Sequence, residues 1–147
     1  MMLSDGDRIR NLLGMYAERM DAGDFEGVGD LFERGVLADA DGRPIASGAE
    51  EVAVFYAGGV QLHDGSPRTR HLVTNTVLSD RAGDGSVTAR SAFVVLQLVG
   101  DGSLHPIAAG RYVDRFEQDD HGTWRFSERR FALDLVGDLS RHWGGPT

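Results

Sequence analysis

TRHLVTNTVLSDRAGDGSVTARSAFVVLQLV, residues 69–99, contains two long runs rich in β-branched and apolar residues on either side of a Gly-Asp-Gly turn. Two more such runs, 103–118 and 123–135, follow after short turns. Successive long strands joined by short turns predict an antiparallel meander. Because these strands exceed the usual length, we expect the sheet to coil strongly and present a concave face.

The sequence before this stretch has helical character. Capping patterns and apolar residues at helical spacing predict helices over 4–21, 24–32 and 47–59. A short hairpin is expected within 35–47, turned at Asp41-Gly42. The sequence therefore predicts an α+β fold in which three N-terminal helices cover the concave face of a sheet.

The chain of 147 residues has the usual size of one domain. We assign residues 1–136 to this domain and residues 137–147 to a glycine-rich C-terminal tail. Within the tail, Leu139 and Trp143 are expected to pack over a pocket mouth or against a partner chain.

Composition excludes several kinds of function. The formal net charge is −8, and a surface of that sign repels nucleic acids and anionic membranes. All 15 cationic residues are arginine and the chain has no cysteine, which excludes Schiff-base lysines, thiol nucleophiles and disulfides. No signal peptide and no apolar run of about 20 residues is evident, so we expect a cytoplasmic location.

Motifs for cofactors and metals are absent. The sequence has no glycine-rich nucleotide loop and no nucleophile elbow, so no cofactor is expected. Its five histidines form no H-x-H or H-E-x-x-H pair, so no metal site is expected. His63, His121 and His142 lie in loops or the tail, where histidine is usually without a function, and His105 precedes a proline near a strand start.

Polar residues interrupt both faces of the predicted strands, which favours a pocket over a dry core. On the first long strand, alternation places His71 and Asn75 on one face. A neutral imidazole in a pocket is suited to removing a proton near neutral pH, although a half-exposed strand histidine is equally common. Asp21, where the first helix ends, is a candidate partner or simply a turn former. Tyr16 lies about 140° from Asp21 around the helix, so only irregular geometry would bring both to one pocket.

The order of several motifs resembles a known family. Its elements are Tyr16, Asp21, Asp24-Phe25, Leu31-Phe32, residues 69–75 (TRHLVTN), residues 110–114 (GRYVD) and residues 122–129 (GTWRFSER). This series resembles the SnoaL-like branch of the nuclear transport factor 2-like superfamily, which includes scytalone dehydratase, bile acid 7α-dehydratase and hexachlorocyclohexane dehydrochlorinase. The resemblance implies a cone-shaped α+β barrel, with a curved mixed sheet around the helices, that forms homodimers or homotrimers.

The resemblance also implies a chemistry. His71 matches the position of a base, Asp21 the position of the acid that orients it, and Arg129 a position that binds the leaving group. Tyr16 or Asn75 would assist in holding the substrate. We therefore expect a cofactor-independent lyase that acts on a small hydrophobic cyclic molecule by dehydratase-like elimination. An isomerase or polyketide cyclase with the same base, a noncatalytic binding protein and an oligomeric accessory subunit are the alternatives.

Overall fold

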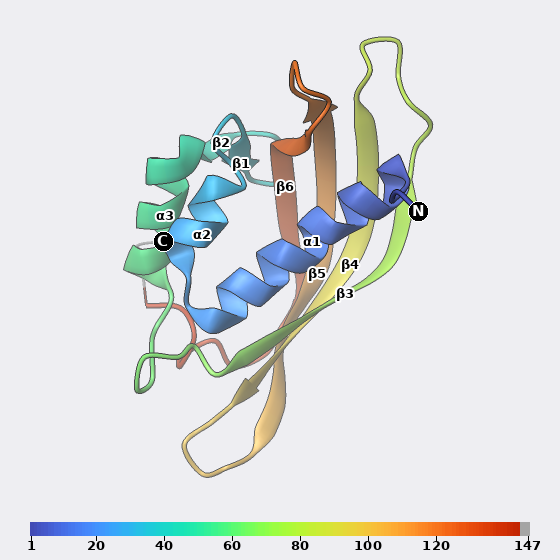
Figure 1. Cartoon of the computed structure of the whole chain (residues 1–147). Coiled ribbons are helices and arrows are strands. Elements are labelled where there is room, and N and C mark those ends of the chain that lie inside the picture. The colour runs from blue at the N-terminus through green and yellow to red at the C-terminus, as the bar shows by residue number, and fades with distance from the viewer. Residues whose placement is uncertain (145–147) are drawn as a thin grey trace.

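A computed structural model describes residues 1–144 and shows helices lying across one side of a curved six-stranded sheet (Figure 1). In space the strands follow the order β2-β1-β6-β5-β4-β3. Their bounds are β1 (Val36–Ala38), β2 (Pro44–Ser47), β3 (Thr69–Leu78), β4 (Val87–Leu98), β5 (Leu104–Gln118) and β6 (Trp124–Val136).

The antiparallel meander predicted from the sequence is confirmed for β3, β4, β5 and β6, each of which pairs with the next. The sheet is mixed because β1 pairs in parallel with β6. Within residues 1–144, β2 and β3 have a strand neighbour on one side only, so the sheet is open and does not close into a barrel. The edge position of β3 leaves backbone groups for contacts with the helices.

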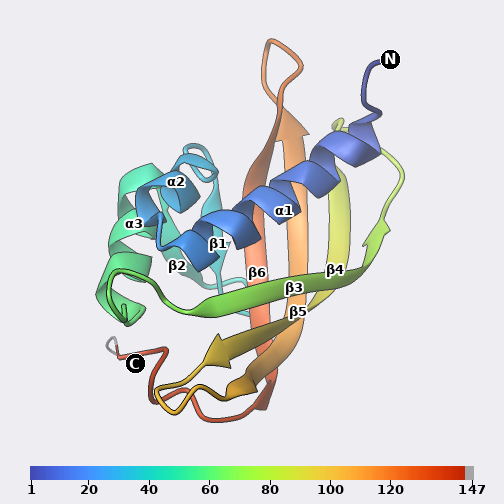
Figure 2. The same cartoon turned by 60° about the horizontal axis from the view of Figure 1, so that its bottom comes forward.

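The three predicted helices are α1 (Asp5–Ala22), α2 (Phe25–Asp30) and α3 (Gly48–Gly59). Ser4 caps α1 through the Asp7 backbone N–H, and Asp24 caps α2 in the same way. The capping box expected at α3 is different: the Ser47 side chain makes no capping bond, and the Ser47 N–H donates to Glu51 instead. Figure 2 shows α1 crossing the sheet while α2 and α3 lie together beside it.

The hydrophobic core fills the space between the helices and the concave face of the sheet, and its centre is aromatic. Phe93 and Tyr112 stack across β4 and β5, and Phe32 of the segment after α2 stacks on Phe126 of β6. Tyr16 packs edge-on against Phe32 and Tyr112. Aromatic pairs of this kind add stability beyond the area they bury, so α1 is fixed tightly on the sheet.

The last strand ends at Val136, and the residues that follow turn back toward α3 (Figure 2). Residues 145–147 of the tail predicted from the sequence lie outside the described residues. In the described part of the chain, every helix is too short or too polar to cross a membrane.

Candidate active site

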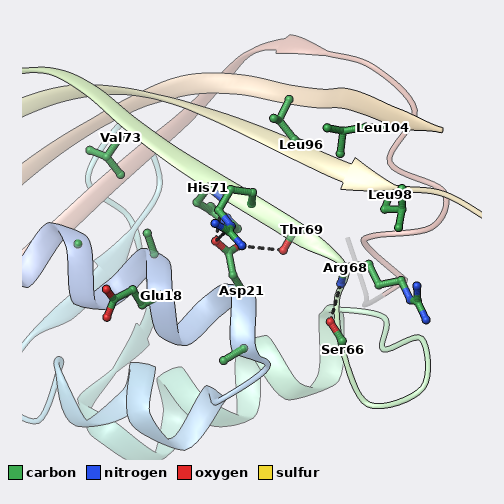
Figure 3. A pocket seen from close by; sticks show the side chains of 14 residues that line it. Glu18, Asp21, Ser66, Arg68, Thr69, His71, Val73, Leu96, Leu98 and Leu104 are labelled. Atoms are coloured by element: carbon green, nitrogen blue, oxygen red, sulfur yellow. Dashed lines mark hydrogen bonds and ion pairs between the residues drawn. The ribbon is translucent and has the colours of Figure 1, made fainter. Parts of the chain in front are cut away.

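Asp21 and His71 are in direct contact, as the sequence predicts. Asp21 lies in the last turn of α1, where Gly23 adopts a left-handed conformation (φ 73°) and turns the chain away. Its Oδ1 is 2.6 Å from Nδ1 of His71 on β3. The Thr69 hydroxyl donates to the same oxygen at 2.9 Å, and the His71 backbone N–H donates to Oδ2 at 2.9 Å. The carboxylate is thus held from three directions (Figure 3).

This contact depends on the position of β3 in the sheet. An edge strand has backbone N–H groups without a strand partner, and Asp21 accepts one of them from His71. The two side chains are largely removed from water, with 6% of the His71 side chain and 12% of the Asp21 side chain exposed. The end of α1 therefore satisfies an edge backbone donor and orients an imidazole at the same time.

The protonation of the pair follows from these bonds. Burial raises the pKa of Asp21, but the hydrogen bonds from the His71 side chain, its backbone N–H and Thr69 lower this pKa more, so the net shift is downward. An ionised carboxylate only accepts hydrogen bonds, so Nδ1 of His71 carries the hydrogen that it donates. In the neutral ring the other nitrogen, Nε2, is then an acceptor.

His71 borders two hollows. The first, which we call the inner cavity, measures about 310 Å³. Its lining residues are Tyr16, Met20, Phe55, Tyr56, Val60, His71, Phe93, Val95, Ala108, Tyr112, Phe131, Leu133, Leu139, His142 and Trp143. This predominance of carbon with a few polar groups is typical of small-molecule sites.

The second hollow, the outer groove, is a broad surface depression of about 990 Å³ between α1 and the end of β3. Glu18, Arg68 and Arg70 line it together with apolar residues such as Leu98 (Figure 3). His71 lines both hollows, whereas Asp21 lines only the outer groove. We take the inner cavity as the candidate site because its few polar groups converge within an apolar lining.

Tyr16 lines the inner cavity although it lies on a different side of α1 from Asp21. Because the sheet curves around α1, two sides of the helix contact it. Asp21 reaches the β3 edge, while Tyr16 is buried in the core. The Tyr16 hydroxyl forms a hydrogen bond with that of Tyr56 on α3. Burial raises the pKa of Tyr16, and raises the pKa of Tyr56 well above its ordinary value, so both hydroxyls keep their protons.

Arg129 lies behind the inner cavity and is absent from its lining. Its guanidinium is fully buried and forms two hydrogen bonds with Asp114, Nε to Oδ1 at 2.7 Å and Nη2 to Oδ2 at 2.9 Å. It also lies over the rings of Tyr16 (4.2 Å) and Tyr112 (3.6 Å). Burial lowers the pKa of Arg129, but the Asp114 carboxylate raises it more, so the charge is retained. Arg129 is therefore separated from the inner cavity by the rings of Tyr16 and Tyr112, so the direct contact with a leaving group that the sequence predicts is not available there.

The expectation that Asn75 shares the inward face of β3 with His71 is wrong. The register of β3 against β4 shifts between Thr74 and Val77, and Asn75 has a positive φ of 56° and is exposed. A bulge of this kind resets the alternation of side chains. Thr76 turns toward β4 instead and bonds Ser91 at 3.0 Å.

Sequence reasoning missed two polar residues of the inner cavity, Tyr56 and His142. Tyr56 lies on an apolar helix face, and no sequence feature distinguished it from the core residues around it. His142 belongs to the tail, which has neither helical nor strand periodicity, so only the packing of the adjacent Trp143 hinted at its position. In residues 1–144 no group of three or more histidine or acidic side chains is arranged to hold a metal ion.

Comparison with solved structures gives the same fold. An NTF2-like protein with a cystatin-like fold from Novosphingobium aromaticivorans is 28% identical, with a TM-score of 0.73 over 93% of this chain and 86% of that chain. A protein of unknown function from Mycobacterium tuberculosis is also 28% identical, with a TM-score of 0.70 over 88% of this chain and 71% of that chain. A protein from Catenulispora acidiphila in complex with S-DNPA is 23% identical, with a TM-score of 0.71 over 87% and 92%.

The comparison with protein families is more specific. The model of the SnoaL-like domain matches residues 1–130, which include α1, the whole meander up to Arg130 and both members of the Asp21–His71 pair. The chain therefore belongs to the SnoaL-like family within the NTF2-like superfamily.

Proposed function

We propose that this protein is a cofactor-independent lyase that eliminates water or another leaving group from a small, largely apolar cyclic molecule in the inner cavity. The observation that carries the proposal is a carboxylate-held imidazole, that of His71, at the wall of a cavity lined mostly by carbon. Such surroundings exclude competing water and strengthen electrostatic interactions. The same fold holds a small molecule in the Catenulispora acidiphila protein, which supports the cavity as a binding site.

In the proposed reaction, Nε2 of His71 removes a proton from a carbon atom of the substrate. The electron pair of the broken C–H bond forms the new C=C bond, and the leaving group departs with the electrons of its own bond. For dehydration, the imidazolium returns its proton to the departing hydroxyl, so water leaves and the base is restored. Asp21 stabilises the imidazolium and holds its orientation throughout.

In our proposal the Tyr16–Tyr56 pair stabilises negative charge on a substrate oxygen. Two hydroxyls joined by one hydrogen bond retain one further hydrogen to donate. The charge of Arg129, 4.2 Å from the Tyr16 ring, lowers the cost of negative charge on the Tyr16 oxygen. Arg129 thus acts through Tyr16 in our proposal. Preorganised donors of this kind contribute strongly to catalysis.

An isomerase is the second candidate, because the tyrosine pair would stabilise an enolate equally well. In that case the imidazolium returns its proton to a different carbon atom and no group leaves. Product analysis separates the two: elimination changes the mass of the substrate by the leaving group, whereas isomerisation leaves the mass unchanged.

The protein is also proposed to form a homo-oligomer, as the family resemblance implies. Leu135 and Val136 at the end of β6 are 71% and 59% exposed. Exposed apolar residues in one region are typical of subunit contacts. An accessory role would need only this surface, and the β subunit of a putative aromatic-ring-hydroxylating dioxygenase from Novosphingobium aromaticivorans shares the fold at 24% identity.

The experiment is a screen of cyclic β-hydroxyketones for the new absorbance of a conjugated enone. A His71→Ala variant should lose activity by about 10²–10⁴-fold, the usual contribution of a general base. His105→Ala is the matched control, because His105 is exposed and lies outside the inner cavity. Native mass spectrometry before and after exposure to cell extract identifies any retained molecule. Unchanged turnover and an unchanged pH profile in His71→Ala would refute the assignment.

A further inference from the structure

The segment that follows β6 is held firmly over the inner cavity. The Gln61 backbone N–H donates to the His142 carbonyl at 2.9 Å, and the Gly144 N–H donates to the Gly59 carbonyl at 2.8 Å. The Gln97 side chain binds the Arg141 carbonyl at 3.0 Å. These bonds fix the backbone on both sides of His142, next to the end of α3 (Figure 2).

Trp143 adds an apolar anchor to the same segment. Its ring lies so close to the backbone of Gly59 that an added Cβ would overlap it, and its centroid is 5.2 Å from that of Phe55. Only glycine permits this approach. Gly59 at the end of α3 therefore fixes the position of the tail, and the neighbouring His142 is held at a defined place in the cavity wall.

The imidazole of His142 has an unsatisfied atom. Its Nδ1 is buried and has no hydrogen-bond partner among residues 1–144, while the ring lines the same cavity as His71. Buried polar atoms in folded proteins are nearly always paired, so an unpaired one calls for a missing partner. Because the ring of His142 lines the inner cavity while Nδ1 itself is covered, a rotation of the imidazole would let a molecule in the cavity supply that partner.

The charge state of the ring suits this role. Burial lowers the pKa of His142 to about 4, and the nearby His71 imidazole adds to this effect while Asp21 opposes it. At neutral pH the ring is therefore uncharged, with one nitrogen that donates and one that accepts. It can bind a hydroxyl or a carbonyl oxygen without bringing a charge into an apolar site.

We propose that His142 determines specificity by forming a hydrogen bond with an oxygen atom of the bound molecule. This inference rests on the proposed function and narrows its substrate class: the ligand is an oxygenated ring compound, and hydrocarbons or halogenated hydrocarbons without oxygen are poor ligands. Sites built around a hydrogen bond reject analogues that lack the partner group, because the protein atom then stays buried and unpaired.

The test compares two probes of nearly equal shape, 2-naphthol and 2-methylnaphthalene, by NMR titration of the protein. The wild type should bind 2-naphthol more tightly, with a change in the ¹⁵N shifts of His142. In His142→Phe, which keeps a ring without nitrogen, affinity for 2-naphthol should fall about 3- to 10-fold while that for 2-methylnaphthalene stays the same or rises. His142→Asn, which keeps a polar atom near the Nδ1 position, should recover part of the preference.

The controls separate this proposal from the broader one. His121→Phe, in an exposed turn outside the cavity, should leave both affinities unchanged. If the wild type binds both probes and His142→Phe weakens both equally or neither, the role of His142 is refuted and the lyase proposal stands. If neither probe binds the wild type, the inference about His142 fails, and the lyase proposal is judged by the His71→Ala comparison alone. If the preference depends on His142 but no turnover depends on His71, the cavity is a binding site without the proposed chemistry.

Discussion

Two carboxylate pairs join neighbouring elements of this protein, and they differ in what each leaves free. Asp21 binds one nitrogen of His71, whose ring lines the inner cavity, and leaves the other nitrogen without a hydrogen bond from residues 1–144. Asp114 binds two nitrogens of Arg129, and both of these side chains are completely buried. The Asp21–His71 pair therefore keeps one ring nitrogen that can accept a proton, whereas the guanidinium of the Asp114–Arg129 pair is covered by the rings of Tyr16 and Tyr112.

The difference shows that a carboxylate bound to a basic side chain can either hold the core together or orient a base. A buried ion pair is costly to assemble and very costly to break, so the Asp114–Arg129 pair makes the core depend on both partners. The Asp21 carboxylate is stabilised by hydrogen bonds from the edge of the sheet, and the imidazole it holds is suited to change protonation during a reaction. We expect mutations of the Asp21–His71 pair to change turnover directly. Mutations of the Asp114–Arg129 pair should act chiefly on stability, and on turnover only through Tyr16.

The largest effect is expected for Asp21→Asn. The His71 backbone N–H must donate to the amide oxygen, which turns the amide NH₂ toward Nδ1 of the imidazole. Nδ1 then becomes the acceptor and Nε2 carries the hydrogen, which is the wrong tautomer for a base. Turnover should fall by about 10²–10⁴-fold, equivalent to about 3–5 kcal/mol. NMR of the ¹⁵N-labelled ring measures the tautomer directly, and activity with an unchanged tautomer would contradict this account.

The next largest effect concerns the buried Asp114–Arg129 pair. Arg129→Met leaves the Asp114 carboxylate buried without a partner and should reduce the free energy of unfolding by about 3–5 kcal/mol. Denaturant unfolding measures the loss. The double variant Asp114→Leu with Arg129→Met is the control and should recover most of it, because apolar residues of similar volume replace buried pairs well. If the single variant is as stable as the wild type, the pair does not hold the core together.

The two pairs also differ in how far they can be predicted from sequence. Asp21 lies at a helix end marked by glycine, and His71 lies near the start of a long strand, so local patterns suffice to bring both forward as candidates. Arg129 faces Asp114 in the register of β6 against β5, and that register depends on irregularities within the two strands. Only the assembled sheet reveals that the guanidinium is already bound.

Local reasoning fails where the chain departs from a regular period. Asn75 left the expected face because one bulge in β3 reversed the alternation. His142 could not be placed because its segment accepts hydrogen bonds from residues far away in the sequence, the backbone N–H of Gln61 and the side chain of Gln97. The fold was predictable because it rests on long periodic elements, and the remaining polar groups of the site were not, because they depend on irregular ones.

The smallest effect is a pH dependence that distinguishes His142 from both pairs. The pKa of His142 is about 4 in the folded chain and its ordinary value is 6.5, so the unfolded chain binds more protons between these values. The contribution of neutral His142 to the free energy of unfolding is complete above pH 6.5 and is lost as the pH falls toward 4. The loss is up to about 3 kcal/mol, and it is smaller if the tail detaches before the rest of the chain unfolds. The lowered pKa of Asp21 means that its contribution is lost only below the ordinary value of 3.8.

Denaturant unfolding and Trp143 fluorescence between pH 7 and pH 4 measure this dependence. The charged or titratable groups that act on His142 are His71, Asp21 and His63, so a change in any of them also moves the transition. His142→Phe is the matched variant, because it keeps a ring in the wall and removes the titrating group. The stability of the wild type relative to this variant should decrease steadily as the pH falls through this window; a difference independent of pH would mean that the ring of His142 is not shielded from water.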